Sequence, residues 1–238
     1  ECISNLNNVA LKYNLKNIKW QIIKTDSLNK SFVSQYFNSF DFVVGNPPYI
    51  RIQHLGRERR KNIQNDWYCC KNGSTDIFIT FFELGFSLLN KNGQLGYITP
   101  NTYLKTNAGE SLREFIKISK SLKTLIDFEY YQLFKNTTTY SIITILDKNH
   151  HKNTFSLYKS DGKNINYIDD ININNLDKRN WVLAPNNVLD KLKKIETRGM
   201  PLNKIAKIHV GITTLADDFY IFKDIRFNNN YAEIKLKD

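Results

Sequence analysis

The sequence predicts an α/β fold built around a mostly parallel sheet. Short apolar runs rich in β-branched and aromatic residues recur between Trp20 and Leu146, and stretches long enough for a helix separate several of them. The composition is that of a globular domain, because 41% of the 238 residues are hydrophobic and 13% are aromatic. Strands that alternate with helices usually pair in parallel, and functional side chains then collect at the carboxyl ends of the strands.

Helices are predicted where apolar residues recur at helical spacing. The first carries Leu6, Val9 and Tyr13 on one face, and Ser4 is its expected N-cap. The second is expected to end at a turn that contains Gly93. The predicted helices span residues 6–13, 77–89 and 112–118.

Strands are predicted where short, β-branched runs are bounded by polar or turn residues. They span residues 20–24, 42–45, 95–99, 124–128 and 140–146. The second predicted strand ends directly before the tetrapeptide Asn46-Pro47-Pro48-Tyr49. Asn46 is therefore expected at the carboxyl end of a strand, where α/β proteins place functional groups.

The composition changes after the last predicted strand. Residues 147–176 are polar and rich in Asn and Asp, without a clear repeat. Apolar residues between Trp181 and Leu192 indicate a short packed segment that leads into a connecting helix, and a new unit begins at Met200. We therefore expect three parts, residues 1–149, 150–199 and 200–238, and we expect both ends of the chain to be cut from larger units.

The net charge of +11 and the pI near 9.4 favour a polyanionic partner such as nucleic acid. The alternative is compositional drift toward Lys and Asn, with the excess lysines forming a solvated surface. Three cysteines cannot build a disulfide framework, and no Cys or His pair stands at zinc spacing, so no metal site is expected. Without a secretory signal or a bilayer-length apolar run, a cytoplasmic protein without a membrane partner is expected.

The tetrapeptide Asn46-Pro47-Pro48-Tyr49 fits methyl transfer to a conjugated amino group, whose delocalised lone pair makes it a poor nucleophile. An Asn oxygen and a backbone carbonyl can each accept one N–H and return that lone pair to the nitrogen. Asn46 and the carbonyl of Pro47 suit these two roles, and the two prolines fix the backbone in advance. Tyr49 offers a π face to a base extruded from a duplex. The alternative interpretation is a Pro-Pro turn that caps a buried strand.

Further segments follow the tetrapeptide in a fixed order. They are Thr75-Asp76-Ile77-Phe78, Phe81-Phe82-Glu83 with Leu88-Leu89, Gly93 to Asn101, Leu112-Arg113-Glu114-Phe115, Leu133-Phe134 with Thr139-Tyr140-Ser141-Ile142-Ile143, and Ile208 to Thr213 with Asp217-Asp218-Phe219. Together with the tetrapeptide they resemble the gamma-class N6-adenine DNA methyltransferases of the TaqI type, including those fused into restriction-modification enzymes. The resemblance covers most of the chain.

The resemblance implies a partial Rossmann-like methyltransferase sheet followed by the start of a DNA-specificity domain. Residues 1–149 then form the catalytic part of the methyltransferase, residues 150–199 a connecting segment, and residues 200–238 the beginning of the specificity domain. The implied cofactor is S-adenosylmethionine, and the implied target is N6 of a flipped adenine in double-stranded DNA. A restriction-modification or phage-defence system is the implied setting.

Two more residues gain a role from the resemblance. Phe134 corresponds to a family phenylalanine that contacts the flipped base, although a phenylalanine before a buried strand is usually core. Asp26 corresponds to an acidic residue that accepts a hydrogen bond from the cofactor's adenine amino group, although it also suits a turn after a strand. No GxG occurs, so the cofactor half is expected to be incomplete unless an N-terminal segment or a partner subunit supplies it.

Basic residues follow the tetrapeptide directly. We expect five of them to contact DNA phosphates beside the flipped base; they are Arg51, Arg57, Arg59, Arg60 and Lys61. Such contacts position DNA without reading its sequence. A solvated helix face is the alternative, because Glu58 interrupts the run.

Two other functions use parts of the same pattern. A protein methyltransferase that modifies glutamine amides of release factors carries the same tetrapeptide, because an amide nitrogen poses the same lone-pair problem. It would not require the specificity-like segment, the motif around Phe134 or the positive charge. A non-catalytic DNA-recognition fragment is the third hypothesis. A nuclease cluster is not recognisable, since Glu233 and Lys235 are a weak match, so any cleavage is expected elsewhere.

Overall fold

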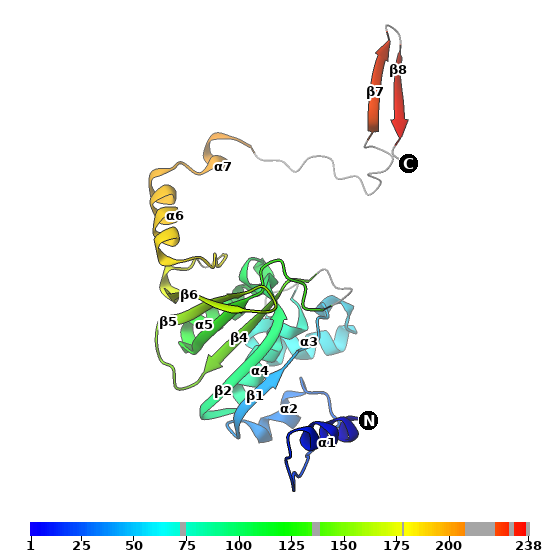
Figure 1. Ribbon diagram of the computed structural model, residues 1–238, viewed down its shortest axis with the longest axis vertical. Helices are drawn as coiled ribbons and strands as arrows, with labels where there is room; N and C mark the ends of the chain where they lie inside the picture. The colour runs from blue at the N-terminus through cyan, green and yellow to red at the C-terminus, as the bar shows by residue number, and fades with distance from the viewer. Residues whose placement is uncertain (72–74, 135–138, 178, 208–221, 229–230, 237–238) are drawn as a thin grey trace. The chain divides into compact units, whose positions relative to one another are not determined.

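The computed structural model describes the chain except for residues 72–74, 135–138, 178, 208–221, 229–230 and 237–238. The chain divides into two compact units, Glu1–Asp190 and Lys191–Asp238. The first unit holds a six-stranded sheet with its helices, and it carries the tetrapeptide Asn46–Tyr49 (Figure 1).

The elements of the first unit follow the order expected of an α/β protein. Its strands are β1 (Phe40–Gly45), β2 (Leu89–Pro100), β3 (Leu122–Asp127), β4 (Ser141–Asp147), β5 (Thr154–Ser160) and β6 (Ile165–Asn172). Its helices are α1 (Cys2–Lys12), α2 (Lys30–Val33), α3 (Arg57–Asp66), α4 (Ile77–Leu88) and α5 (Glu110–Ser119), and α6 (Asn186–Arg198) begins in this unit. The predicted helices near residues 77 and 112 and the four predicted strands from residue 42 onward are confirmed. The turn expected at Gly93 is wrong, because α4 ends at Leu88 and Gly93 lies inside β2.

The strand order is β1-β2-β4-β3-β5-β6. β1 is parallel to β2, and β3 is parallel to β5, whereas β4 is antiparallel to both β2 and β3, and β6 is antiparallel to β5. Four strands therefore share one direction, but the predicted predominance of parallel pairing is wrong. Among the described residues no helix lies between β3 and β4 or between β5 and β6, so the chain returns directly and pairs antiparallel.

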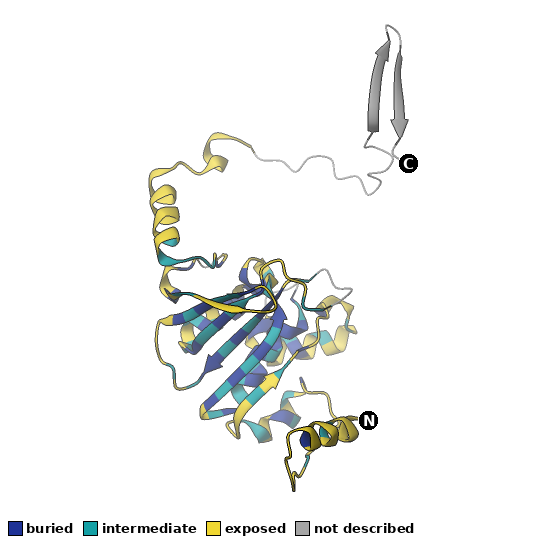
Figure 2. Cartoon of the chain, viewed as in Figure 1, coloured by how far each residue is buried: buried dark blue, intermediate teal, exposed yellow. Residues whose placement is uncertain are grey.

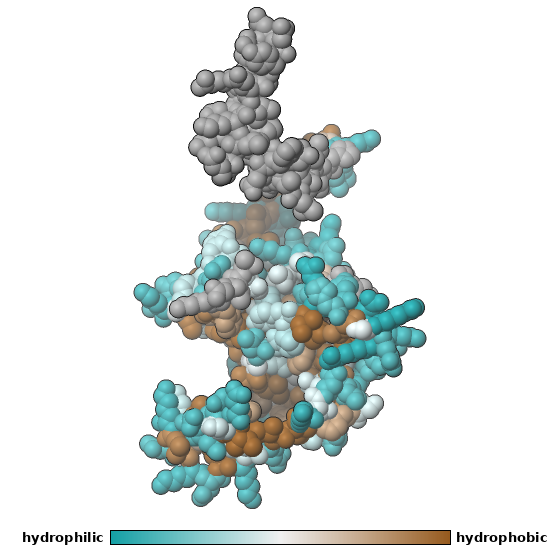
Figure 3. Space-filling model, turned by 90° about the vertical axis from the view of Figure 1, so that its right-hand side faces the viewer, coloured by the Kyte–Doolittle hydropathy of each residue, from teal (hydrophilic) through white to brown (hydrophobic). Residues whose placement is uncertain are grey.

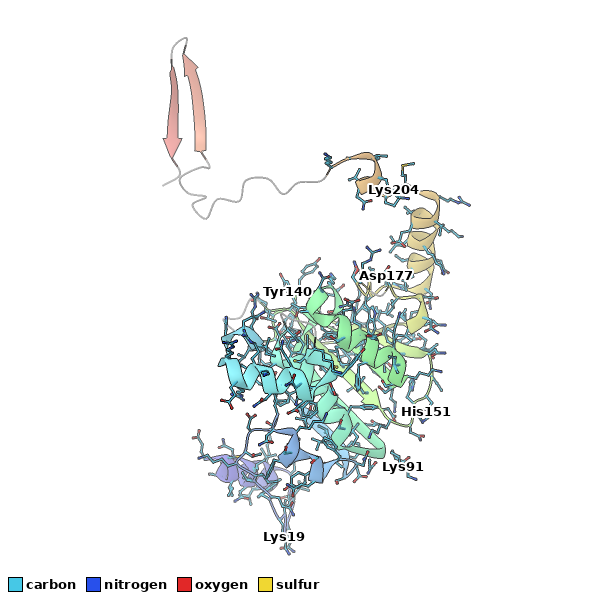
Figure 4. The ribbon with its side chains drawn as sticks, turned by 180° about the vertical axis from the view of Figure 1, so that it is seen from behind. Lys19, Lys91, Tyr140, His151, Asp177 and Lys204 are labelled. Carbon is cyan, nitrogen blue, oxygen red and sulfur yellow. The ribbon has the colours of Figure 1, made fainter. Side chains whose placement is uncertain are left out.

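Helices α3, α4 and α5 lie on one face of the sheet (Figures 1 and 4). β2 turns its buried residues Leu95 and Tyr97 toward α4, where the rings of Tyr97 and Phe82 meet at 5.3 Å. A Cβ added at Gly85 of α4 would meet both Leu95 and Tyr97 within 2.5 Å, so this glycine sets the close approach of helix to strand. The main hydrophobic core forms between this face and the helices.

β1 is the edge strand of the described sheet, and its outer side is apolar. Phe42 is 72% exposed and Val44 is 83% exposed (Figure 2). Figure 3 looks onto this side of the molecule and shows hydrophobic surface there. In the described sheet, β1 forms backbone hydrogen bonds along one edge, through its parallel pairing with β2.

Two predictions near the N-terminus are wrong. Residues 20–24 form no strand, and Ile22 and Ile23 are each 48% exposed, because an apolar run becomes a strand only where a neighbour pairs with it. The first helix begins earlier than expected. Its N-cap is Glu1, so Ser4 lies inside α1 and does not cap it.

The polar stretch after Asp147 contains two strands that the composition did not predict. β5 and β6 form a hairpin that extends the sheet beyond residue 149, with Phe155, Leu157 and Ile171 buried in the core. The connecting helix predicted after Trp181 is confirmed as α6.

The second unit contains the end of α6, the short helix α7 (Leu202–Ile205) and an antiparallel hairpin of β7 (Phe222–Asn228) and β8 (Tyr231–Leu236). The motif segments at residues 208–213 and 217–219 lie outside the described residues.

Candidate active site

The four strands that share one direction end at one edge of the sheet. β1 ends at Gly45, β2 at Pro100, β3 at Asp127 and β5 at Ser160, so the chain after each strand emerges on the same side. Figure 4 shows Tyr140, which leads into β4, at this edge, whereas Lys91 and His151 lie at the opposite end. Asn46, which follows β1, therefore lies at the carboxyl edge, as the sequence predicted.

The tetrapeptide loop leaves β1 with its polar groups exposed. Pro47 is buried, while Asn46, Pro48 and Tyr49 are exposed. Directly after the loop, the chain is tied to the start of α4. The N–H of Ile52 donates to the Thr75 carbonyl at 2.8 Å, and the N–H of Ile77 donates to the Ile50 carbonyl at 2.8 Å. The buried proline and these bonds hold the loop at both ends.

A hydrogen bond inside the loop orients Asn46. The Tyr49 hydroxyl donates to Asn46 Oδ1 at 2.7 Å, and it lies 3.5 Å from the Ile98 carbonyl of β2. The Tyr49 ring packs edge-on against Phe78 of α4, with 6.2 Å between centroids. Burial raises the pKa of Tyr49, so the hydroxyl keeps its proton at neutral pH. Because Oδ1 has a second lone pair, the amide oxygen retains acceptor capacity toward a ligand.

The other side of the same loop borders a cavity of about 350 Å³. Its lining residues are mostly apolar and surround one carboxylate; they are Thr25, Asp26, Ser27, Leu28, Pro48, Ile50, Leu55, Arg59, Ile77 and Phe81. Pro48 and Ile50 thus form a wall of this cavity, while Asn46 and Tyr49 meet across the loop. The same loop therefore contributes residues to the cavity and to the contact between Asn46 and Tyr49. A cavity with apolar walls and a carboxylate acceptor fits a planar ring that carries an amino group.

The carboxylate of that cavity is paired. Asp26 Oδ2 lies 3.1 Å from a guanidinium nitrogen of Arg59, and Asp26 Oδ1 accepts from the Leu28 N–H at 3.1 Å. Arg59 was predicted to contact DNA phosphates and Asp26 to contact the cofactor, so the structure brings together two residues that were assigned to different ligands. The pair could not be predicted from sequence, because the two residues lie far apart along the chain.

The remaining predicted residues fall in two places. Arg57, Arg60 and Lys61 lie in the first half of α3, and Arg51 is exposed, with its backbone paired to Asp76 in an isolated bridge. Phe134 is half-buried in the loop between β3 and β4, which starts at the same edge as the tetrapeptide loop.

Among the described residues, no group of three or more His, Cys, Asp or Glu side chains is placed to hold a metal ion. Cys69 and Cys70 are free thiols buried in the core, as expected of packing residues. Within the described part of the chain, no helix combines the length and apolar character needed to cross a membrane.

The fold is that of a DNA-methyltransferase region from restriction-modification systems. The chain belongs to the Eco57I restriction-modification methylase family, whose profile matches residues 1–134. One solved structure, a cryo-electron microscopy structure of a DrdV–DNA complex, shares the fold with a TM-score of 0.52 at 12% identity, over 76% of this chain and 23% of that chain.

Curated relatives match most of the chain. The type II restriction enzyme and methyltransferase RM.Eco57I of Escherichia coli is 34% identical over 220 residues, which cover 86% of this chain and 21% of the relative. The type II methyltransferase M.HincII of Haemophilus influenzae is 26% identical over 238 residues, which cover 88% of this chain and 43% of the relative. The chain therefore spans between about a fifth and somewhat under half of these relatives.

Proposed function

We propose that this chain forms the catalytic part of an enzyme that transfers a methyl group from S-adenosylmethionine to N6 of a flipped adenine in double-stranded DNA, within a restriction-modification system. Membership of the Eco57I family gives the reaction class. The observation that carries the finer proposal is the exposed Asn46 at the carboxyl end of β1, next to a cavity suited to an amino-bearing ring.

Asn46 and Pro47 supply the two acceptors that the reaction needs. Asn46 Oδ1 and the Pro47 carbonyl each accept one hydrogen of the adenine amino group, which withdraws its lone pair from the ring. The buried ring of Pro47 and the hydrogen bond from Tyr49 place these acceptors before the substrate arrives. Preorganisation of this kind lowers the barrier, because the acceptors need not reorganise during the reaction.

Tyr49 supplies the stacking surface. Tyr49 is 39% exposed, so we assign its ring as the stacking surface for an extruded base, which recovers part of the unstacking cost of about a few kcal/mol. We assign Phe134 a second contact with the same base, because its loop begins at the same edge. These aromatic contacts hold the base while Asn46 engages its amino group.

The cavity beside Pro48 suits the adenine moiety of the cofactor. Pro48, Ile50 and Phe81 provide apolar walls, and Asp26 accepts a hydrogen bond from the adenine amino group. Bound S-adenosylmethionine supplies the electrophilic methyl group. Because one loop borders this cavity and presents Asn46, the protein sets the two ligands relative to each other.

Cations near the start of α3 suit DNA phosphates. Arg57, Arg60 and Lys61 lie near the positive end of the helix dipole, where cations are unfavourable, so helix stability does not account for them. Together with Arg51 they position the duplex without reading its sequence. In this proposal residues 200–238 begin the domain that reads the sequence, and the residues that follow β6 connect it to the catalytic part.

The proposal is tested with Asn46→Ala in the native protein that carries this chain. Methyl transfer to duplex DNA should fall by about 10²–10³-fold or more, because one of two preplaced polar contacts is lost. DNA affinity should stay close to that of the unsubstituted protein. The measurement is incorporation of labelled methyl groups, with N6-methyladenine identified after digestion of the DNA.

The matched control is Asn62→Ala, which removes an exposed asparagine of α3 and should leave turnover unchanged. A release-factor protein is assayed in parallel. Preferential methylation of that protein would replace the DNA proposal with the glutamine alternative. Near-normal turnover of Asn46→Ala would refute the assigned mechanism, and DNA binding without any methyl transfer by the native protein would favour a recognition fragment.

A further inference from the structure

Arg59 lies on the cofactor side of the tetrapeptide loop and contacts Asp26. We propose that Arg59 is a positioning residue that gives the cavity its selectivity for a 6-amino purine over a 6-oxo purine, by fixing the Asp26 carboxylate as an acceptor. This inference rests on the proposed function, because it assumes that the cavity holds the adenine moiety of the methyl donor. It removes Arg59 from the set of phosphate contacts.

The carboxylate of Asp26 is held from both sides. Oδ2 meets Arg59 at 3.1 Å, and Oδ1 accepts from the Leu28 N–H at 3.1 Å. Each oxygen of an ionised carboxylate can accept about two hydrogen bonds, so acceptor capacity remains after both contacts. The Asp26 carboxylate therefore offers hydrogen-bond acceptors to a ligand in the cavity.

The two residues are carried on segments that a buried contact joins. The indole N–H of Trp67, which directly follows α3, donates to the Leu28 carbonyl at 3.1 Å. Trp67 and Ile63 are buried in one hydrophobic cluster with Leu28. The end of α3 and the turn after Asp26 are thus fixed relative to each other, and the rigid helix carries Arg59 beside Asp26.

Stability alone does not account for this ion pair. The side chains of Arg59 and Asp26 are 52% and 44% exposed, and exposed pairs contribute little to folding. Arg59 also lies in the first turn of α3, where the helix dipole disfavours a cation. A role toward a ligand of the cavity explains why an arginine stands there.

Adenine and hypoxanthine differ at the position that this pair would read. The 6-amino group donates to a carboxylate, whereas the 6-oxo group of hypoxanthine is an acceptor and would face another acceptor. Sites that hydrogen-bond a polar ligand group discriminate strongly against an analogue that leaves them unpaired. With Arg59 absent, the Asp26 side chain gains rotamer freedom, and the two nucleosides should be distinguished less well.

The experiment measures binding of S-adenosylhomocysteine and S-inosylhomocysteine to the native protein by calorimetry. The unsubstituted protein should prefer the adenosyl compound by about tenfold or more. Arg59→Ala should reduce this preference to about two- to threefold, and Arg59→Lys should restore part of it. A purely structural role would weaken both nucleosides equally and leave the preference unchanged.

Two further variants define the mechanism. Asp26→Ala should lose the preference, and adding Arg59→Ala to it should have little further effect, because Arg59 acts through Asp26. Arg57→Ala is the matched control on the same helix, two residues away and on a different side. It should weaken DNA binding and lower its salt dependence while leaving nucleoside preference unchanged.

An unchanged preference in Arg59→Ala, in a protein that binds and discriminates normally, would overturn this inference and leave the proposed function intact. Weaker DNA binding by Arg59→Ala, with normal nucleoside preference, would return Arg59 to the phosphate contacts. If the unsubstituted protein bound neither nucleoside, the proposed function itself would fail. Binding of both nucleosides with equal affinity by the unsubstituted protein would also overturn the inference.

Discussion

Two turns leave the same edge of the sheet, and each leads to a helix that begins after a glycine. The turn after β1 exposes Asn46 and Tyr49 and reaches α3 at Gly56. The turn after β2 buries Tyr103 and reaches α5 at Gly109. The two turns thus occupy equivalent positions in the fold, but one exposes its polar side chains and the other buries its tyrosine.

Arg113 of α5 accounts for much of this difference. It is 1% exposed and donates to the carbonyls of Tyr103 at 2.6 Å, Thr106 at 2.8 Å and Arg179 at 2.6 Å. Arg59 of α3, in contrast, is exposed and meets one carboxylate at the border of a cavity. Arg113 uses its donors on backbone carbonyls and so stabilises the turn itself. Arg59 pairs with one carboxylate that can still accept a hydrogen bond from a ligand in the cavity.

The largest effect on stability is expected from Arg113→Met. The substitution removes the charged donor from the buried Tyr103 carbonyl and from the partly buried carbonyls of Thr106 and Arg179, and a buried carbonyl left unsatisfied costs about 1–3 kcal/mol. The free energy of unfolding should fall by about 3 kcal/mol or more. Urea denaturation followed by circular dichroism measures the change.

Arg57→Met serves as the matched control for Arg113→Met, because Arg57 is exposed. It should alter the free energy of unfolding by less than about 0.5 kcal/mol. Equal losses in the two variants would show that the turn after β2 does not depend on Arg113. The contrast between the two turns would then rest on burial alone.

Glycine substitutions probe the same contrast with a smaller change. A Cβ added at Gly109 would lie 2.1 Å from the Tyr103 carbonyl oxygen, which is backbone and cannot rotate away. Gly109→Ala should therefore lower the free energy of unfolding by about 1–3 kcal/mol. A Cβ at Gly56 would meet nothing within 4 Å, so Gly56→Ala should change stability by less than about 0.5 kcal/mol.

Thermal unfolding of the two alanine variants separates the outcomes. The midpoint should fall clearly for Gly109→Ala and stay near that of the unsubstituted protein for Gly56→Ala. Similar midpoints would indicate that the turn after β2 shifts to admit a methyl group. It would then be as adaptable as the turn that carries Asn46.

Local periodicity was sufficient for several elements around the site, although it did not predict α3. Helices α4 and α5 and strands β1 to β4 follow patterns that can be read within a short window, so Asn46 could be placed at the end of a strand. The alternation of Phe155 and Leu157 with polar residues, before a turn at Gly162, was an equally local signal for β5. The Asn-rich composition around that signal obscured it.

Pairing between distant segments could not be predicted in the same way. Residues 20–24 have strand-like composition but pair with no strand in the described part of the chain, and the antiparallel insertion of β4 between β2 and β3 depends on the whole sheet. At the site, the contact between Asp26 and Arg59 arises because Trp67 joins their segments. Sequence patterns identified the chemical groups, and packing decided which of them meet.

The hydroxyl of Tyr49 offers the finest test of how the exposed turn works. In Tyr49→Phe, Asn46 Oδ1 loses its donor while the ring keeps its place beside Phe78. The lost hydrogen bond is worth about 1 kcal/mol, so kcat for methyl transfer should fall by about three- to tenfold. KM for duplex DNA should change little, because the stacking face remains. Steady-state kinetics on duplex DNA measure both constants.

Tyr49→Ala should lower kcat further and also weaken DNA binding, since it removes the ring. Tyr68→Phe, which removes a hydroxyl that donates to Glu114 at 2.6 Å, is the control for loss of a tyrosine hydrogen bond elsewhere.

Burial raises the pKa of Tyr49 above its ordinary value, so its donor is present below that value and is lost only as the pH rises through the raised pKa. The ratio of the Tyr49→Phe rate to the unsubstituted rate should therefore stay constant from about pH 7 to 9. A ratio of one throughout would mean that the tetrapeptide orients Asn46 without Tyr49, and that the two prolines alone set the acceptors.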